Sequence, residues 1–268
     1  MPTQPSSSSA PGILLPAFED GLGRRYRPVT RAAETPSEVL CFRPDLTDVP
    51  SFEFSLRERV SSLADFRHSY YARIRKVDRL SDELGTVALI SDCVPGTRLA
   101  EILAAIEHGG PILSIDAALS LVRQLAPAMA LLHDHLHVAH GAMGPERLIV
   151  TPQARVLIVE HVIGAALEQL KYSRERYWKE LRIAVPMSVG LPRFDKRTDL
   201  TQLGVVALSL ILGRPIREDE YPASVEDLVA AARARRADGS REPLPTALRD
   251  WWTQTLQLDA PHSYLSMS

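Results

Sequence analysis

One stretch of the chain, residues 131–164, limits the possible folds more than any other. It reads LLHDHLHVAHGAMGPERLIVTPQARVLIVEHVIG, so a helix end rich in histidine is followed by a Gly/Pro loop and two short apolar runs. The runs at residues 148–150 and 155–159 are separated by Thr-Pro-Gln-Ala, which is typical of a turn. The stretch therefore predicts a helix that leads through a sharp loop into a small hairpin.

The loop resembles the catalytic loop of eukaryotic-type Ser/Thr protein kinases, in which His-Arg-Asp-Leu-Lys-Pro-Glu-Asn is followed by a hairpin and Asp-Phe-Gly. His140, Pro145 and Glu146 match this pattern and fix the register. The resemblance covers residues 21–259 and is more specific in the second half of the chain. It implies an α+β fold of the bilobal protein-kinase type, with a small strand-rich N-lobe and a mainly helical C-lobe.

The positions that carry the chemistry in kinases differ in this chain. Ala142 stands where kinases have the aspartate that accepts the substrate hydroxyl proton, and an alanine side chain cannot act as a base. Gly144 replaces the lysine that contacts phosphate, and Arg147 replaces an asparagine that ligates magnesium, although a guanidinium has no acceptor atom. Glu160 stands at the D-F-G aspartate and could by itself still contact a cation. The resemblance thus implies a degenerate member, a pseudokinase, without a metal site.

The nucleotide-binding elements of kinases are incomplete here as well. Residues 21–23 (Gly-Leu-Gly) match two glycines of the phosphate-covering loop, but Tyr26 falls where the third would be, so an ordinary turn is the simpler interpretation. Arg43 is the best match to the nucleotide lysine at the end of the third strand. The gatekeeper and hinge positions of the expected cleft are Ser91, Asp92 and Cys93. We expect these residues to form a degenerate cleft that binds ATP weakly or not at all.

Residues 53–67 have the apolar spacing of an amphipathic helix and resemble the kinase helix whose glutamate pairs with that lysine. Arg59 falls at the glutamate position, and two arginines would not pair. A shift of one residue would bring Glu58 to Arg43 instead; in the alternative interpretation Glu58 is a solvated charge on the helix surface.

The C-lobe contains the strongest structural match, at residues 197–215, which resemble the buried central helix of the kinase fold. The aspartate in its first turn, Asp199, holds the catalytic-loop backbone in that family, so we expect a structural role for it. Residues 116–137 predict a long amphipathic helix that leads into the loop. Four histidines follow closely at positions 133, 135, 137 and 140, but they lack the acidic or thiolate partners that would favour a metal site.

Residues 165–181 (AALEQLKYSRERYWKEL) predict a helix where active kinases keep an open activation segment. Its aromatic residues Tyr172, Tyr177 and Trp178 lie among charged residues, and aromatic and arginine side chains are enriched at interfaces. We therefore predict that they form a partner-binding surface; the alternative is that they belong to the core. Met187 replaces the glutamate of the A-P-E element, and the arginine that would pair with it is also missing.

Length and composition fit one globular protein of two lobes, because 268 residues with 45% hydrophobic residues can bury a substantial core. Residues 1–12 are rich in Ser and Pro and predict a disordered leader; residues 13–94 and 95–268 would form the two lobes. A net charge of −2 indicates neither nucleic acid nor membrane as a partner. Two cysteines and no signal peptide favour the cytoplasm, and the Ala/Arg/Pro-rich composition favours a bacterial source.

Three functions remain open at this stage. The first is a catalytically inactive pseudokinase that binds another protein in signalling, as a regulatory module without a cofactor. The second is a residual or atypical Ser/Thr kinase that still binds ATP. The third is a purely structural domain that serves as a scaffold for other segments.

Overall fold

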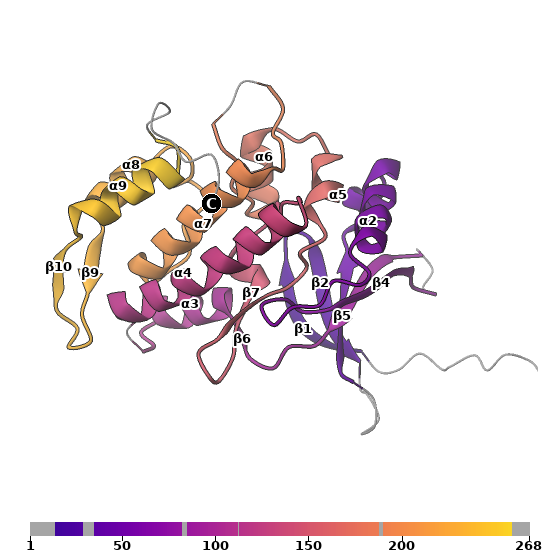
Figure 1. Cartoon of the computed structure of the whole chain (residues 1–268), viewed down its shortest axis with the longest axis horizontal. Helices are drawn as coiled ribbons and strands as arrows, with labels where there is room; N and C mark the ends of the chain where they lie inside the picture. The colour runs from indigo at the N-terminus through magenta and orange to yellow at the C-terminus, as the bar shows by residue number, and fades with distance from the viewer. Residues whose placement is uncertain (1–13, 29–34, 82–84, 112, 188–189, 259–268) are drawn as a thin grey trace, which may run out of the picture.

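The structure is a computed structural model that describes residues 14–28, 35–81, 85–111, 113–187 and 190–258. The leader predicted at residues 1–12 lies outside the described residues. Two lobes lie side by side, one built around a sheet and the other mainly of helices (Figure 1).

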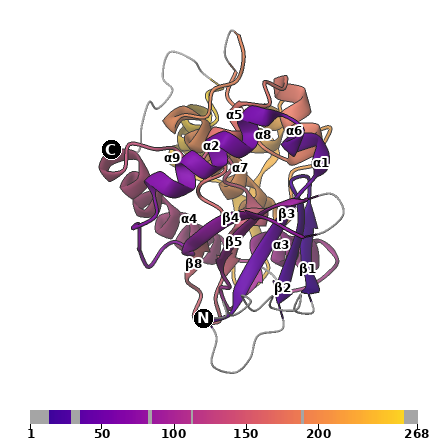
Figure 2. The same ribbon diagram turned by 90° about the vertical axis from the view of Figure 1, so that its right-hand side faces the viewer.

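The N-lobe contains a five-stranded antiparallel sheet in the order β1-β2-β3-β5-β4. Its strands are β1 (Leu14–Asp20), β2 (Gly23–Pro28), β3 (Ser37–Phe42), β4 (Ile74–Arg79) and β5 (Val87–Asp92). Two helices follow β3, namely α1 (Pro44–Thr47) and α2 (Pro50–Ser62). Both helices begin with proline, whose fixed φ suits the first helical position. Helix α2 lies across one face of the sheet (Figure 2), slightly N-terminal to the helix predicted at residues 53–67.

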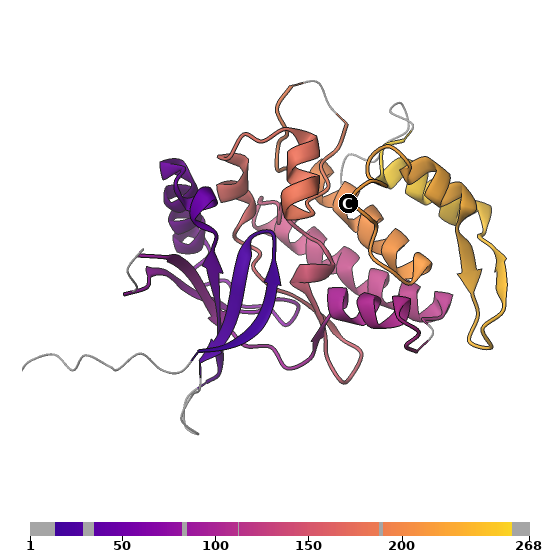
Figure 3. The ribbon, with the colours of Figure 1, turned by 180° about the vertical axis from the view of Figure 1, so that it is seen from behind.

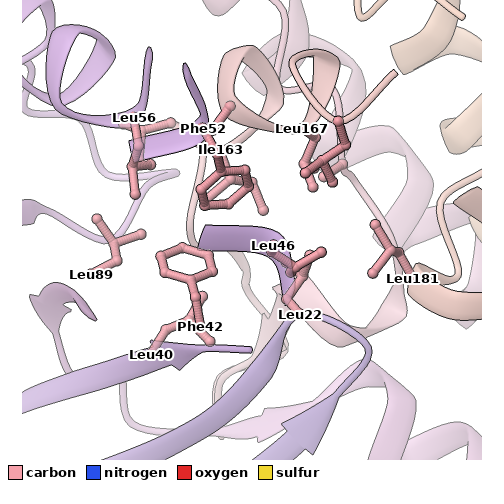
Figure 4. Close-up of a cluster of buried hydrophobic side chains, with 14 of the residues drawn as sticks. Leu22, Leu40, Phe42, Leu46, Phe52, Leu56, Leu89, Ile163, Leu167 and Leu181 are labelled. Carbon is pink, nitrogen blue, oxygen red and sulfur yellow. The ribbon is translucent and has the colours of Figure 1, made fainter. Parts of the chain in front are cut away.

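The core of the N-lobe lies between the sheet and α2. Leu40 and Phe42 of β3 belong to the same buried cluster as Phe52 and Leu56 of α2, and the Phe42 and Phe52 rings meet edge to face with centroids 5.3 Å apart (Figure 4). This cluster also contains Leu22 from the β1–β2 turn and, from the C-lobe, Ile163, Leu167 and Leu181. One hydrophobic core therefore joins the two lobes.

The C-lobe is mainly helical. Its helices are α3 (Leu99–Glu107), α4 (Ile115–Ala130), the π-helical turn η1 (Leu131–His135), α5 (Gly164–Glu168), α6 (Arg174–Leu181), α7 (Lys196–Leu212), α8 (Val225–Ala231) and α9 (Thr246–Thr255). A small antiparallel sheet and a 3-10 turn lie near the N-lobe: β6 (Thr97–Arg98), η2 (Pro145–Arg147), β7 (Leu148–Val150) and β8 (Val156–Ile158). Strands β7 and β8 form the hairpin that the sequence predicts.

Helix α7 is the buried centre of the C-lobe, as the sequence predicts. Its first turn is capped by Asp195, whose Oδ1 accepts hydrogen bonds from the backbone N–H groups of Arg197 (2.9 Å) and Thr198 (3.2 Å). The helix ends at Gly213, which adopts the left-handed conformation with φ 69°. Its middle carries Gly204, whose backbone carbonyl accepts a hydrogen bond from Trp252 Nε1 of α9 (3.1 Å), so α9 packs closely on α7.

The segment formed by α4 and η1, Ile115–His135, is long and apolar enough to span a membrane by length and composition, with a mean hydropathy of 1.4. Its side chains Leu125, Met129 and Leu132 are nevertheless buried in one cluster with Leu203 and Leu210 of α7. The segment is therefore a core helix of the C-lobe in this structure.

A second hairpin, β9 (Arg233–Arg235) and β10 (Arg241–Pro243), connects α8 to α9. It extends from the end of the C-lobe that lies farthest from the N-lobe sheet (Figures 1 and 3). Ala234 and Leu244 attach the hairpin to the core through their buried side chains.

Candidate functional site

The loop at residues 140–147 is held in place by Asp199 at the start of α7. Its carboxylate accepts hydrogen bonds from the backbone N–H of His140 (2.8 Å) and the backbone N–H of Gly141 (2.6 Å), and it contacts His133 Nε2 at 2.8 Å. Asp199 is completely buried, so these bonds replace all of its contacts with water. The predicted structural role of Asp199 is confirmed by these contacts.

His140 fixes the shape of the same loop from inside. Its Nδ1 accepts a hydrogen bond from the Ala142 N–H (3.2 Å), and its Nε2 lies 3.2 Å from the backbone carbonyl oxygen of Val159. Burial lowers the pKa of His140, which keeps the imidazole neutral and suits one acceptor and one donor nitrogen. His140 therefore serves the backbone of the loop.

Ala142, at the position of the kinase base, lies inside the hydrophobic core. Its exposed fraction is 1%, and it belongs to the same buried cluster as Leu22 and Leu181. Gly144 lies against Glu146, because a Cβ built on Gly144 would be 2.6 Å from the Glu146 Oε2. A longer side chain at either position would thus have to displace its neighbours.

Glu160, at the position of the D-F-G aspartate, pairs with an arginine of the N-lobe. Arg25 in β2 donates from Nε to Glu160 Oε1 (2.7 Å) and from Nη2 to Glu160 Oε2 (2.8 Å), which is a bidentate pair between the lobes. The same guanidinium donates to Asp20 Oδ1 at 2.6 Å. The Arg25 side chain is completely buried and that of Glu160 is 3% exposed, so water is excluded from the pair.

Further charged side chains extend this contact into a cluster between the lobes. Arg147 Nη2 donates to Asp20 Oδ2 (2.9 Å), and its Nε lies 3.5 Å from Glu160 Oε2. Arg98 forms an ion pair with Glu38 of β3 and donates to the backbone carbonyl of Glu146. We call this set of residues the interlobe ion cluster: Asp20, Arg25, Glu38, Arg98, Arg147 and Glu160.

An aromatic side chain covers one side of this cluster. The ring centroid of Phe18 in β1 is 4.9 Å from the Arg98 guanidinium carbon and 5.4 Å from that of Arg25. Such contacts between a cation and an aromatic face are favourable, and they gain strength where water is absent. The cluster is therefore enclosed by an apolar group as well as by charges.

The charges in the cluster determine the ionisation of Glu160. Burial alone would raise its pKa, but the guanidinium of Arg25, with those of Arg98 and Arg147, lowers the pKa to about 2. Burial likewise acts to lower the pKa of Arg25, and the carboxylates of Glu160 and Asp20 raise it. Both partners are therefore ionised at neutral pH.

The interlobe ion cluster does not fit a magnesium nucleotide. Both carboxylate oxygens of Glu160 accept hydrogen bonds from Arg25, and Arg147 brings a cation to the position where kinases have a metal ligand. Within the part of the chain that the structure describes, no group of three His, Cys, Asp or Glu side chains is arranged to hold a metal ion.

Arg43 is not part of the interlobe ion cluster, and nucleotide binding by this residue stays a prediction. The residue lies just after β3 and before α1, where its guanidinium pairs with Asp45 (2.6 Å) and lies 3.6 Å from Glu180. The Arg43 guanidinium also donates from Nη1 to the backbone carbonyl oxygen of Gly21 in the β1–β2 turn (3.1 Å). The alternative pair between Glu58 and Arg43 does not form either, and Glu58 is exposed.

The predicted hinge residues lie where β5 leads toward the C-lobe. Ser91 is buried opposite Glu38 of β3, and Asp92 pairs with Arg75 at 2.6 Å. The backbone N–H of Cys93 donates to the carbonyl of Pro36 (3.0 Å), and burial raises the pKa of its thiol. These contacts are structural, and nucleotide binding by the three residues stays a prediction.

The aromatic surface predicted at Tyr172, Tyr177 and Trp178 is wrong, because all three side chains are buried. Their exposed fractions are 7%, 0% and 4%. The predicted single helix is two helices, α5 and α6, and this break turns the aromatic residues inward. The Tyr177 hydroxyl donates to the carbonyl of Leu167 (2.7 Å), and Trp178 Nε1 donates to that of Glu218 (2.9 Å). The alternative that they are core residues is correct.

The site also contains residues that the sequence analysis missed, chiefly Arg25 and Asp20. Arg25 is the inward-facing member of the alternating pattern in β2, between exposed Arg24 and half-buried Tyr26. The alternation of residues along β2 could have placed Arg25 on the buried face, and a buried arginine needs a carboxylate partner.

No protein-family model matches the sequence. Among solved structures, the chain is similar to the PknI kinase domain of Mycobacterium tuberculosis. One structure of that domain has a TM-score of 0.65 at 14% sequence identity, and the match covers 97% of this chain and 95% of that chain. A second structure of the same domain has a TM-score of 0.63 at 17% sequence identity, and the match covers 97% of this chain and 96% of that chain. The maize SIRK1 kinase domain bound to AMP-PNP has a TM-score of 0.61 at 16% identity, covering 96% and 88%. The chain has the bilobal α+β fold of protein kinases.

Proposed function

We propose that this protein is a catalytically inactive kinase-like domain, a pseudokinase, which acts as a protein-binding regulatory module in the cytoplasm. The observation that carries the proposal is the buried bidentate pair between Arg25 and Glu160. It uses the one carboxylate that remains at a metal-binding position of the kinase motif. A nucleotide with its magnesium would have to break this pair and leave buried charges without partners.

The composition of the loop supports the same conclusion. A positioned base contributes about 10²- to 10⁴-fold to such reactions, and Ala142 has no polar side-chain atom. Arg147 is paired with Asp20 and is not a metal ligand. Phosphoryl transfer depends on the base and the metal ligands acting together. A chain without both the base and a metal ligand therefore loses proton abstraction as well as charge stabilisation by the metal.

Two measurements test this proposal. The first is phosphate transfer from labelled ATP to a generic Ser/Thr peptide, compared between the wild type and Glu160→Gln; we expect no transfer from either protein. The second is a thermal-shift titration with ATP, with and without magnesium. A ligand at a hundredfold excess over its dissociation constant adds about 2.7 kcal/mol, and we expect no such stabilisation.

Each measurement has an outcome that contradicts the proposal. Transfer that is present in the wild type and lost in Glu160→Gln would show that Glu160 still supports catalysis. Stabilisation by ATP that requires magnesium would favour the atypical ATP-binding kinase. Stabilisation without magnesium that is lost in Arg147→Gln would mean that the arginines of the interlobe ion cluster bind phosphate.

A further inference from the structure

The β9–β10 hairpin presents three arginines on its outer face. In the antiparallel register Arg235 lies opposite Arg241, and Arg233 lies two residues from Arg235 on the same strand. Residues two apart in a strand share a face, so the Cβ atoms of the three arginines lie on one side of the hairpin, while Ala234 between them points into the core. We call the surface formed by Arg233, Arg235 and Arg241 the arginine face.

The carboxylates of the hairpin form hydrogen bonds with groups outside the arginine face and do not neutralise its charge. Glu242 accepts a hydrogen bond from Arg236 Nε at 2.8 Å, and Asp238 accepts from the backbone N–H of Ser240 at 2.9 Å within the turn. Among the described residues, neither the Arg235 nor the Arg241 guanidinium has an ion-pair partner. Like charges directly opposite each other destabilise a strand pair. The hairpin therefore keeps an unfavourable pair of cations, with Arg241 exposed and Arg235 half-buried.

Arg233 adds a third guanidinium that is held in place. Its Nη1 donates to the carbonyl oxygens of Ala231 and Ala232, both at 3.0 Å, at the C-terminal end of α8. Its other nitrogens have no partner among the described residues. One arginine is thus oriented by the backbone, and the opposite pair can close around a bound group.

We propose that the arginine face binds a phosphorylated serine or threonine in an extended segment of a partner protein. Opposite residues in an antiparallel pair have Cβ atoms about 5 Å apart, so the forks of Arg235 and Arg241 can reach one group. A phosphate dianion has three terminal oxygens that can accept hydrogen bonds from two guanidinium groups, whereas one carboxylate can accept a bidentate pair from only one guanidinium group. The surface therefore fits phosphate better than aspartate or glutamate.

The surroundings favour this partner over other polyanions. Each strand has three residues and spans about 10 Å, which suits one or two phosphate groups. Exposed carboxylates on the flanking helices, at Glu226, Asp227 and Asp250, would repel a long nucleic acid. No large exposed hydrophobic side chain of the described residues lies on the hairpin, so it has no group to insert into a lipid surface.

This inference rests on the proposed function, because it names the partner of the binding module. It concerns a different part of the molecule, since the hairpin and the N-lobe lie at opposite ends of the structure (Figure 3). ATP and phosphate-transfer measurements report on the cleft, and peptide binding reports on the hairpin. Failure of one proposal can therefore be distinguished from failure of the other.

The test uses the full chain and two fluorescent nonapeptide libraries that exclude acidic residues, one with phosphoserine and the other with serine fixed at the centre. We expect the wild type to prefer the phosphoserine library at least tenfold. Arg235→Glu and Arg241→Glu should each abolish this preference, because each removes a fork and adds a negative charge. Arg155→Glu, at an exposed arginine in the β7–β8 turn, is the matched control and should keep it.

Stability separates a binding role from a structural one. Arg235→Glu places a carboxylate opposite Arg241, so its melting temperature should equal or exceed that of the wild type while binding is lost. Each of three results with the peptide libraries would overturn the proposal: no preference for phosphoserine in the wild type, the same preference in both hairpin variants, or equal preference for a library with central glutamate. Tighter binding to a single-stranded oligonucleotide or to phosphatidylserine vesicles than to the phosphoserine library would also overturn it.

Discussion

The backbone of Gly21 lies directly against the backbone of Glu180: a Cβ atom at Gly21 would be 1.9 Å from the carbonyl oxygen of Glu180. The turn between β1 and β2 therefore packs on the end of α6, with the adjacent Leu22 completely buried. In the kinase resemblance these glycines belong to a loop that covers phosphate. Here the same turn covers the C-lobe itself.

The first prediction concerns this contact. Gly21→Ala should separate the turn from α6 and destabilise the protein by about 1–3 kcal/mol, the usual range for overpacking. Urea denaturation measures the change. Gly109→Ala is the control, because a Cβ at this position would meet no atom within 4 Å. Its loss of stability would reflect only the strain of a left-handed backbone at φ 91°. A loss at Gly21 that is no larger than at Gly109 would contradict the close packing.

The second prediction concerns Arg25. Arg25→Met leaves Glu160 and Asp20 buried without their main partner, so we expect a loss of about 3–5 kcal/mol in the free energy of unfolding. Arg24→Met is the matched control on the same strand, since Arg24 is exposed and pairs at the surface with Glu19; little change is expected there. If both variants unfold at the same urea concentration, the interlobe pair is not a major source of stability.

The third prediction concerns the buried aromatic residue Trp178, whose ring lies 4.7 Å from that of Tyr221. Trp178→Ala removes a large core side chain and should cost about 3–5 kcal/mol. Phe54→Ala, at a ring that is 69% exposed, should change stability by less than about 0.5 kcal/mol. Thermal unfolding of the two variants compares them. A stable Trp178→Ala protein would restore the surface interpretation of this residue.

The fourth prediction concerns pH and His161, which packs edge-on against Phe66 and Tyr71. Burial, with smaller effects of His140 and Arg59, lowers its pKa from 6.5 to about 3. The folded state thus keeps His161 neutral while the unfolded chain takes up a proton below pH 6.5. Its contribution to stability is complete above pH 6.5 and is lost as pH falls toward 3, by up to about 1.4 kcal/mol per pH unit.

His161→Phe isolates this effect, because a phenyl ring suits the aromatic surroundings and does not titrate. Between pH 6.5 and 4.5 the wild type should lose stability faster than the variant, as measured by urea denaturation at several pH values. Glu160 changes the free energy of unfolding mainly below pH 4.5, because its pKa is lowered in the folded state. Burial raises the pKa of Glu146, so its contribution to stability grows as the pH falls. Both are common to the two proteins. Equal slopes would mean that His161 takes up its proton at the same pH in the folded protein as in the unfolded chain.

The sequence predicted the parts of the structure that depend on local pattern. The loop at His140, the hairpin after it and the helix that carries Asp199 are each encoded by residues close in the chain, with Gly and Pro at the turns. The architecture of the two lobes followed from these elements together. Asp199 could be assigned because its role is attached to a fixed position in the helix.

The remaining part of the site depends on contacts between distant residues. Arg25 and Glu160 are 135 residues apart, and nothing in either local sequence specifies the other as partner. Arg43 was assigned from its place after a strand, but the chain turns into α1 at that residue. The burial of Trp178 depends on the break between α5 and α6, because helix-forming composition alone does not show which face meets the core.

The hydrophobic core shared by the lobes limits how this protein can transmit a signal. Pulling the lobes apart would expose Leu22, Leu46 and Leu181 to water, at about 1.5–3 kcal/mol for each side chain. Opening and closing between nucleotide-loaded and empty forms is therefore costly for this molecule. We expect the molecule to behave instead as one rigid body, whose two ends keep a constant distance and orientation.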